Sequence, residues 1–186
     1  MKGEITYFEK LGKVNTDEAL RLAKQTAQVR GIRTIAVASH TGYTAERAME
    51  VFKDTGALLI VGGSSKDRFS PEILKRLEAA GHKVLFTSET SKELPDQPNT
   101  TLRRICEGMR VVVRITTAMV DNGLLKPRQR VVAVAGTGPV RFEKEGGGAD
   151  TVVVMDVSGL EEFFKEDYYK QDRMRIREII CKPIYP

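Results

Sequence analysis

The sequence predicts a three-layer α/β fold, with a mostly parallel sheet covered by helices on both faces. Short apolar segments alternate with amphipathic segments over most of the 186 residues, which is typical of parallel strands joined by helices. The clearest strand is the apolar segment Thr34–Ser39. Apolar residues then recur at helical spacing, at Ala45, Ala48 and Phe52. Because no repeat or linker interrupts this alternation, we expect a single domain over residues 1–186.

The first half of the chain supplies four predicted strands and three predicted helices. Each strand is a short apolar segment, and the four are Ile5–Phe8, Thr34–Ser39, Ala57–Val61 and Lys83–Thr87. Each helix begins at a polar residue that can cap its first turn and ends near a glycine. These helices are predicted at Thr16–Gly31, Thr44–Asp54 and Ser70–Gly81, and a loop is expected at Lys10–Asn15.

The second half begins with a polar segment, Ser88–Thr100, which contains two prolines and is predicted as an unusually long loop. The longest predicted helix follows at Leu102–Asn122, and we expect it to be buried because it is apolar over much of its circumference. The last predicted strand, Met174–Cys181, is placed at a sheet edge, where its arginines would discourage aggregation. The remaining predictions are strands at Arg130–Ala135, Thr151–Val157 and Met174–Cys181, a charged excursion at Val140–Gly147 and a short helix at Leu160–Tyr169.

The composition is that of an ordinary soluble globular protein, with 41% hydrophobic residues, 30% charged residues and a net charge of +5. The charges are mixed along the chain, so nucleic acid is not expected as a partner. The longest uncharged apolar run, Val131–Val140, is about half of a membrane span, and we expect no secretory signal because residues 1–10 are charged and lack an apolar core. Cys106 and Cys181 lack partners at metal-ligand spacing, which predicts buried thiols, a reducing cytoplasm and no metal site.

The candidate site is the turn that joins the strand Thr34–Ser39 to the next helix. Ser39, Thr41 and Thr44 place three hydroxyls in this turn. Gly42 lets the backbone approach a ligand closely. The free amide groups and the positive dipole end of a helix favour an anion at that position. The sequence therefore predicts that this turn binds the phosphate of a small molecule.

Two other loops of small residues follow predicted strands, and we expect them to meet this turn at one pocket. They are Gly62-Gly-Ser-Ser65 and Gly136-Thr-Gly138. Ligands bind outside the carboxyl ends of the strands in open α/β sheets, and the loops are predicted at such ends. The second loop does not fit the dinucleotide fingerprint G-x-G-x-x-G, because Arg141 replaces the third glycine and Pro139 intervenes.

The segment Ser39-His-Thr-Gly-Tyr-Thr-Ala45 resembles a turn in the C-terminal α/β domain of pyruvate kinases, where Thr-x-Ser-Gly-x-Thr/Ser-Ala follows the first strand. The order of Gly136-Thr-Gly138 and Gly148-Ala-Asp-Thr151 resembles small free-standing archaeal and bacterial proteins classed with this domain. In pyruvate kinases the domain is regulatory, and the turn holds a phosphate of fructose 1,6-bisphosphate in the enzymes that this sugar activates. The resemblance implies a phosphate cradle at Ser39, Thr41, Gly42 and Thr44. The catalytic barrel is absent from this sequence, so pyruvate kinase activity is not expected.

His40 and Tyr43 differ from the usual sugar-phosphate turn, and their rings could flank a planar group. The expected ligand is therefore a sugar phosphate or a nucleotide such as flavin mononucleotide (FMN). We expect a non-catalytic or regulatory protein that forms a homo-oligomer through its helices. The expected ligand contacts are Ser39, His40, Thr41, Gly42, Tyr43, Thr44, Gly62, Gly63, Gly136, Thr137, Gly138 and Thr151.

Three alternatives remain open at this level. The hydroxyls of the turn could serve only to cap the following helix. The protein could be a small flavin-dependent or phosphate-ester enzyme that uses His40 and Tyr43 for proton transfer, with His40 protonated beside the phosphate. It could also be a partner-binding module that acts through the 88–100 loop.

Overall fold

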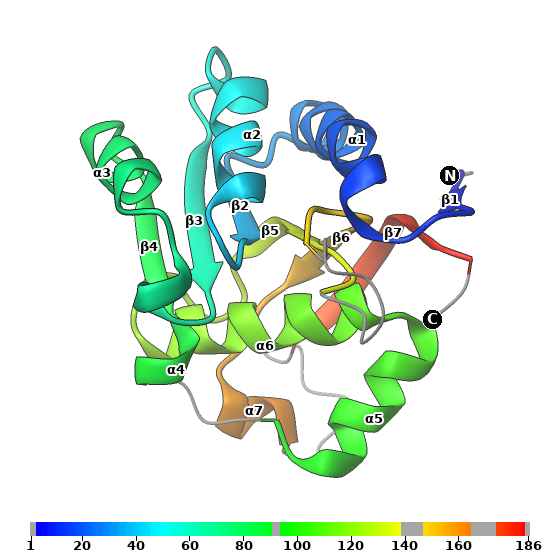
Figure 1. Ribbon diagram of the computed structural model, residues 1–186. Helices are drawn as coiled ribbons and strands as arrows, with labels where there is room; N and C mark the ends of the chain where they lie inside the picture. The colour runs from blue at the N-terminus through cyan, green and yellow to red at the C-terminus, as the bar shows by residue number, and fades with distance from the viewer. Residues whose placement is uncertain (1–2, 91–93, 139–146, 165–173, 185–186) are drawn as a thin grey trace.

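The computed structural model describes residues 3–90, 94–138, 147–164 and 174–184 of the chain (Figure 1). One sheet of seven strands runs through it, in the order β1-β7-β6-β5-β2-β3-β4. The strands are β1 (Thr6–Phe8), β2 (Thr34–Ala38), β3 (Leu58–Gly63), β4 (Lys83–Phe86), β5 (Arg130–Ala135), β6 (Thr151–Asp156) and β7 (Arg175–Pro183). The helices are α1 (Thr16–Arg30), α2 (Tyr43–Phe52), α3 (Pro71–Ala79), α4 (Thr87–Thr90), α5 (Asp96–Ile105), α6 (Glu107–Asp121) and α7 (Leu160–Phe164), with 3-10 turns η1 (Gly12–Asn15) and η2 (Lys66–Arg68).

Most pairings in the sheet are parallel, as predicted. Strands β1 and β7, β5 and β2, β2 and β3, and β3 and β4 pair in parallel, whereas β6 runs antiparallel to both β5 and β7. The register places Ile35 of β2 beside Leu59 of β3 on one side and Val132 of β5 on the other. The carboxyl ends of β2, β3, β4 and β5 therefore lie along one rim of the sheet.

Residues of the central strands alternate between two apolar clusters, one on each face of the sheet. Val37 and Leu59 pack under α1, α2 and α3, whereas Ala36 and Ile60 pack under α6. Figure 1 shows the same division, with α1, α2 and α3 on one side of the sheet and α5, α6 and α7 on the other. The described residues thus form the expected α/β layers.

The predicted limits of α1 and α3 are confirmed, because local chemistry decides them. Gly31 ends α1 in the left-handed conformation, with φ of 64°, which a glycine adopts without strain. The Ser70 side chain accepts a hydrogen bond from the Ile73 amide at 3.4 Å and so caps α3. Pro71 occupies the first position of α3, where its missing N–H removes no helical hydrogen bond.

The predicted loop at Ser88–Thr100 is wrong, because α4 and the first half of α5 occupy its described part. Pro98 lies in the first turn of α5, where an amide would have no helical partner. A single helix over Leu102–Asn122 is also wrong. Cys106 has an extended backbone, with φ of −176° and ψ of 162°, and separates α5 from α6.

The break at Cys106 lets α6 sit close to β6. A Cβ added at Gly108, near the start of α6, would lie 2.1 Å from Oγ1 of Thr151. Cys106 and Cys181 are buried free thiols, as predicted. Burial raises the pKa of the Cys106 thiol and raises the pKa of Cys181 to about 12, so both thiols stay protonated at neutral pH.

The predicted edge position of the last strand is wrong, because β7 pairs with β1 on one side and β6 on the other. Its Arg177 forms an ion pair instead, because Arg177 Nε lies 2.7 Å from Asp156, which also bonds Nε of Arg130 on β5 at 2.7 Å. Of the predicted excursion Val140–Gly147, only Gly147 lies within the described residues, and residues 165–169 of the predicted short helix also lie outside them. None of the helices in the described ranges has the length and apolar character needed to cross a membrane.

Candidate functional site

A cavity of about 200 Å³ lies at the carboxyl ends of β2, β3 and β5. The three predicted small-residue loops all contribute to its lining, together with α6. In Figure 1, β2 and β3 point toward α6, and Arg110, Arg114 and Ile115 of this helix line the cavity. The cavity therefore has one wall of loops that follow strands and an opposite wall made by a helix.

Ser39 is the first residue of the turn that joins β2 to α2. Its amide donates to the Gly62 carbonyl at 3.0 Å, and its Oγ accepts a hydrogen bond from the Ala45 amide at 3.2 Å. The hydroxyl thus bonds an amide in the first turn of α2, which begins at Tyr43 with Gly42 at its N-cap, so the predicted cap at Thr44 is wrong. Thr44 lies inside the first turn and is buried. Ser39, His40 and Thr44 line the cavity.

Thr41 and Gly42 do not line the cavity, although both were expected to contact the ligand. Thr41 is exposed, and its carbonyl accepts a hydrogen bond from the Ser70 amide at 3.0 Å. Gly42 precedes α2 with φ of 101°, and a Cβ added to it would lie 2.9 Å from Cδ1 of Ile73. These two residues therefore dock the turn against α3.

Tyr43 and Thr151 also lie outside the lining. The Nζ of Lys13 lies 4.7 Å from the centre of the Tyr43 ring, which is cation–π geometry. Thr151 is fully buried and donates to Oδ1 of Asp150 at 2.9 Å. Both side chains thus make contacts within the protein rather than with the cavity.

Gly62 and Gly63 line the cavity but belong to β3, so their prediction as a loop is wrong. They pair in parallel with Leu85 and Phe86 of β4. A Cβ added to Gly62 would lie 2.9 Å from Cγ2 of Ile115, a residue of α6. Glycine is therefore required here for the close approach of the helix wall, not for a turn.

The loop Gly136-Thr-Gly138 follows β5 and lines the cavity as expected. The Thr137 amide donates to Oδ2 of Asp150 at 3.0 Å, which fixes the loop. The Thr137 side chain is 8% exposed, and its Oγ1 has no hydrogen-bond partner among the described residues. A buried hydroxyl beside a cavity is poised to bond a polar group that enters it.

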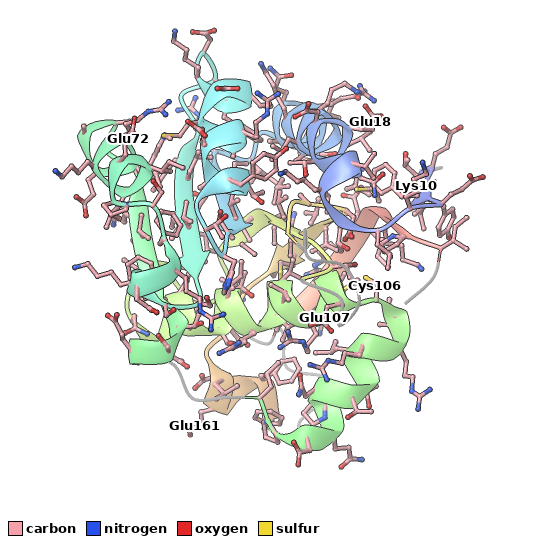
Figure 2. The ribbon with its side chains drawn as sticks, in the orientation of Figure 1. Lys10, Glu18, Glu72, Cys106, Glu107 and Glu161 are labelled. Atoms are coloured by element: carbon pink, nitrogen blue, oxygen red, sulfur yellow. The ribbon has the colours of Figure 1, made fainter. Side chains whose placement is uncertain are left out.

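Arg110 and Arg114 of α6 line the cavity one helical turn apart, and the sequence reasoning missed both. Oε1 of Glu107 accepts a hydrogen bond from Nε of Arg110 at 2.9 Å, which orients that guanidinium. Figure 2 shows Glu107 at the start of α6, next to Cys106. The signal in the sequence was a pair of arginines at i and i+4 within a helix expected to be buried.

His40 bonds Ser64 through Nδ1, and its Nε2 lies 3.4 Å from Nη1 of Arg68. A guanidinium only donates, so Nε2 accepts and Nδ1–H donates to the Ser64 hydroxyl. Burial lowers the pKa of His40, the Arg68 charge lowers it further, and Asp67 opposes this shift. The imidazole is therefore neutral at pH 7, and the Ser64 hydroxyl keeps its own hydrogen for a ligand in the cavity.

A larger hollow of about 640 Å³ lies between α2 and α3. It is lined by Leu58, the first residue of β3, and by charged residues of both signs, Glu50 and Arg76. It lies at the amino end of the parallel strands, whereas ligands of open α/β sheets bind at the carboxyl ends. The smaller cavity is therefore the candidate site.

The hydrogen bond between the Ala45 amide and the Ser39 hydroxyl gives a first prediction. Ser39→Ala removes the acceptor of the Ala45 amide and should lower the free energy of unfolding by about 1 kcal/mol. Thr41→Ala, in the same turn but exposed, should change it by less than about 0.5 kcal/mol. Urea denaturation of both variants measures this difference, and equal effects would contradict a stabilising role for the Ser39 hydroxyl.

The electrostatic character of the cavity is clear from its lining. Among the described lining residues, Arg110 and Arg114 are cationic and none carries a carboxylate. With Ser39, Thr44 and Thr137, the cavity offers many hydrogen-bond donors to an anion.

A comparison of the chain with protein-family models gives no match.

Proposed function

We propose that the protein binds a phosphorylated small molecule in the cavity at the carboxyl ends of β2, β3 and β5. The observation that carries the proposal is a lining with two arginines, several hydroxyls and glycine backbone, and no carboxylate among its described residues. Guanidinium groups hold phosphate oxygens through paired, charge-assisted hydrogen bonds. Glycines allow the same oxygens to approach backbone amides closely.

The buried hydroxyl of Thr137 supports the proposal independently of charge. Its Oγ1 has no hydrogen-bond partner among the described residues, and a phosphate oxygen in the cavity would supply an acceptor for it. The same cavity is lined by Ser39, His40 and Thr44. These residues lie at the start of α2, where the helix dipole favours negative charge. The resemblance of this turn to the phosphate-binding turn of pyruvate kinase C-terminal domains points the same way.

The size of the cavity bears on the class of ligand. At about 200 Å³ it is smaller than the roughly 300–1,000 Å³ of sites that enclose drug-sized molecules. A sugar phosphate matches this volume. With FMN or another nucleotide, the phosphate and the adjoining sugar or polyol would occupy the cavity, and the ring system would extend beyond it.

We infer a binding or regulatory role rather than catalysis. The enzyme alternative used His40 and Tyr43 together, but Tyr43 packs against Lys13 outside the cavity lining. The hydrogen bonds of His40 make it a donor to Ser64 rather than a base for it. This arrangement suits a protein that binds its ligand without converting it.

Thermal stabilisation tests the proposal. Inorganic phosphate, ribose 5-phosphate, AMP and FMN should be compared with ribose, adenosine and riboflavin. At 100 times its dissociation constant, a ligand should stabilise the protein by about 2.7 kcal/mol. Stabilisation by phosphorylated members alone is expected. The proposal fails if no phosphorylated compound stabilises the protein, or if the unphosphorylated counterparts do so equally well.

His40 predicts that anion binding depends on pH. Its pKa is lowered in the unliganded protein, and a bound anion would raise it, because an adjacent negative charge favours the imidazolium. Binding should therefore take up a proton, and affinity should rise as pH falls toward 6. Calorimetric titration with sulfate, which stays dianionic over this range, measures the effect without titration of the ligand. His40→Gln should remove the pH dependence, and an unchanged dependence in that variant would exclude His40 as its origin.

A further inference from the structure

Asp150 lies immediately before β6 and is fully buried. Its Oδ2 accepts hydrogen bonds from the amides of Gly12, at 2.8 Å, and Thr137, at 3.0 Å. Its Oδ1 accepts a hydrogen bond from Oγ1 of Thr151 at 2.9 Å. One carboxylate thus joins the loop before α1, the loop after β5 and the start of β6.

The backbones of these segments approach so closely that glycines are required. A Cβ added to Gly136 would lie 2.3 Å from the carbonyl oxygen of Gly148, and one added to Gly12 would lie 3.0 Å from that of Gly147. Gly148 has φ of 79°, and a Cβ there would lie 2.5 Å from Cα of Lys13. The loop before α1 is therefore packed directly behind the wall of the cavity.

We propose that Asp150 is a positioning residue of this binding site. It holds the loop Gly136-Thr-Gly138 so that the hydroxyl of Thr137 faces the ligand, and it couples the loop before α1 to occupancy of the cavity. Asp150 itself does not line the cavity, so it acts through Thr137. This inference rests on the proposed function, because it assigns the residue that shapes the proposed phosphate contact.

The chemistry of the contact explains why an acceptor is needed. The amides of Gly12 and Thr137 converge on one oxygen atom, and neither would have that partner in Asp150→Ala. Buried amides without an acceptor are strongly unfavourable, so the two loops would move apart to reach water. Thr137 would then leave its position beside the cavity.

Nuclear magnetic resonance of the ¹⁵N-labelled protein, titrated with inorganic phosphate, tests the proposal. In the wild type, the amide signals of Thr137 and Gly12 should shift together with one dissociation constant, although Gly12 does not line the cavity. A shift of Thr137 without Gly12 would overturn the coupling. No saturable shift at any cavity residue would defeat the proposed function itself and this inference with it.

Variants separate positioning from general stability. Asp156 lies at the other end of β6, 8% exposed, where it bonds Arg130 and Arg177. Asp150→Ala and Asp156→Ala should both lower the melting temperature, but only Asp150→Ala should weaken phosphate binding, by at least about tenfold. Equal affinities in the two variants would overturn the proposal.

The conservative variant Asp150→Asn provides a rescue and covers the case in which Asp150→Ala does not fold. The amide oxygen of asparagine can still accept from Gly12 and Thr137, while its NH₂ group donates to Oγ1 of Thr151. The hydroxyl of Thr151 can then turn to Sγ of Cys106, 3.5 Å away. Asp150→Asn should therefore bind phosphate within about threefold of the wild type. A loss of tenfold or more in this variant would overturn the positioning role.

Discussion

Replacing Arg110 and Arg114 together by alanine should weaken binding of a phosphorylated ligand by about a hundredfold or more. Each charge-assisted hydrogen bond contributes about 1.5–3 kcal/mol, and two at the lower end amount to about 3 kcal/mol. We use the lower end because Glu107 already neutralises part of the Arg110 charge. Isothermal titration calorimetry with the best ligand of the thermal panel measures the loss.

Arg103→Ala is the matched control for this double variant. Arg103 bonds the same carboxylate, with its Nε 2.9 Å from Oε2 of Glu107, but it lies on α5 and does not line the cavity. Its removal should leave the dissociation constant within about threefold of the wild type, because an exposed ion pair contributes little. The cavity assignment would be refuted by equal losses in the control and the double variant, or by full affinity in the double variant.

The largest effect on stability is expected for Gly136→Ala. The added methyl group would lie 2.3 Å from the carbonyl oxygen of Gly148, and a backbone atom cannot rotate away as a side chain can. The loops must shift, and overpacking of this kind should lower the free energy of unfolding by about 3 kcal/mol. For a chain of this length, the melting temperature should fall by about 6–12 °C. Differential scanning calorimetry measures the shift.

Gly138→Ala tests the same loop without the clash. A Cβ added to Gly138 meets no atom of the described residues within 4 Å, so the melting temperature should change by less than about 2 °C. Gly136→Ala should also weaken phosphate binding, because Thr137 moves with the loop. Similar melting temperatures for the two variants would show that contact with Gly148 does not constrain Gly136.

Features decided within a few residues could be predicted from the sequence. The predicted strand Thr34–Ser39 corresponds to β2, Thr34–Ala38, whose apolar residues are suited to burial on both faces. The Ser70-Pro71 pair starts α3, and Gly31 ends α1, because each residue satisfies a local backbone requirement. The position of the loops after β2 and β5 at one rim follows from parallel strands.

Features decided by distant contacts could not be predicted. Gly62 has the sequence signature of a turn, but it continues β3 because it pairs with Ala38 of β2 and Leu85 of β4. Arg110 and Arg114 could be assigned to the site only when the position of α6 relative to the cavity was known. That position depends on the extended backbone at Cys106, for which a helical pattern contains no signal.

The direction of β6 has a consequence for how such a protein can change its ligand. Since β6 runs opposite to β5, the connection between them leaves the rim at Gly136–Gly138 and returns to it at Gly147–Asp150. Because Gly138 and Gly147 both line the cavity, substitutions at these two positions would alter its lining while both strands keep their partners. Selection could therefore adjust which molecule is admitted without disturbing the framework that carries the anion-binding groups.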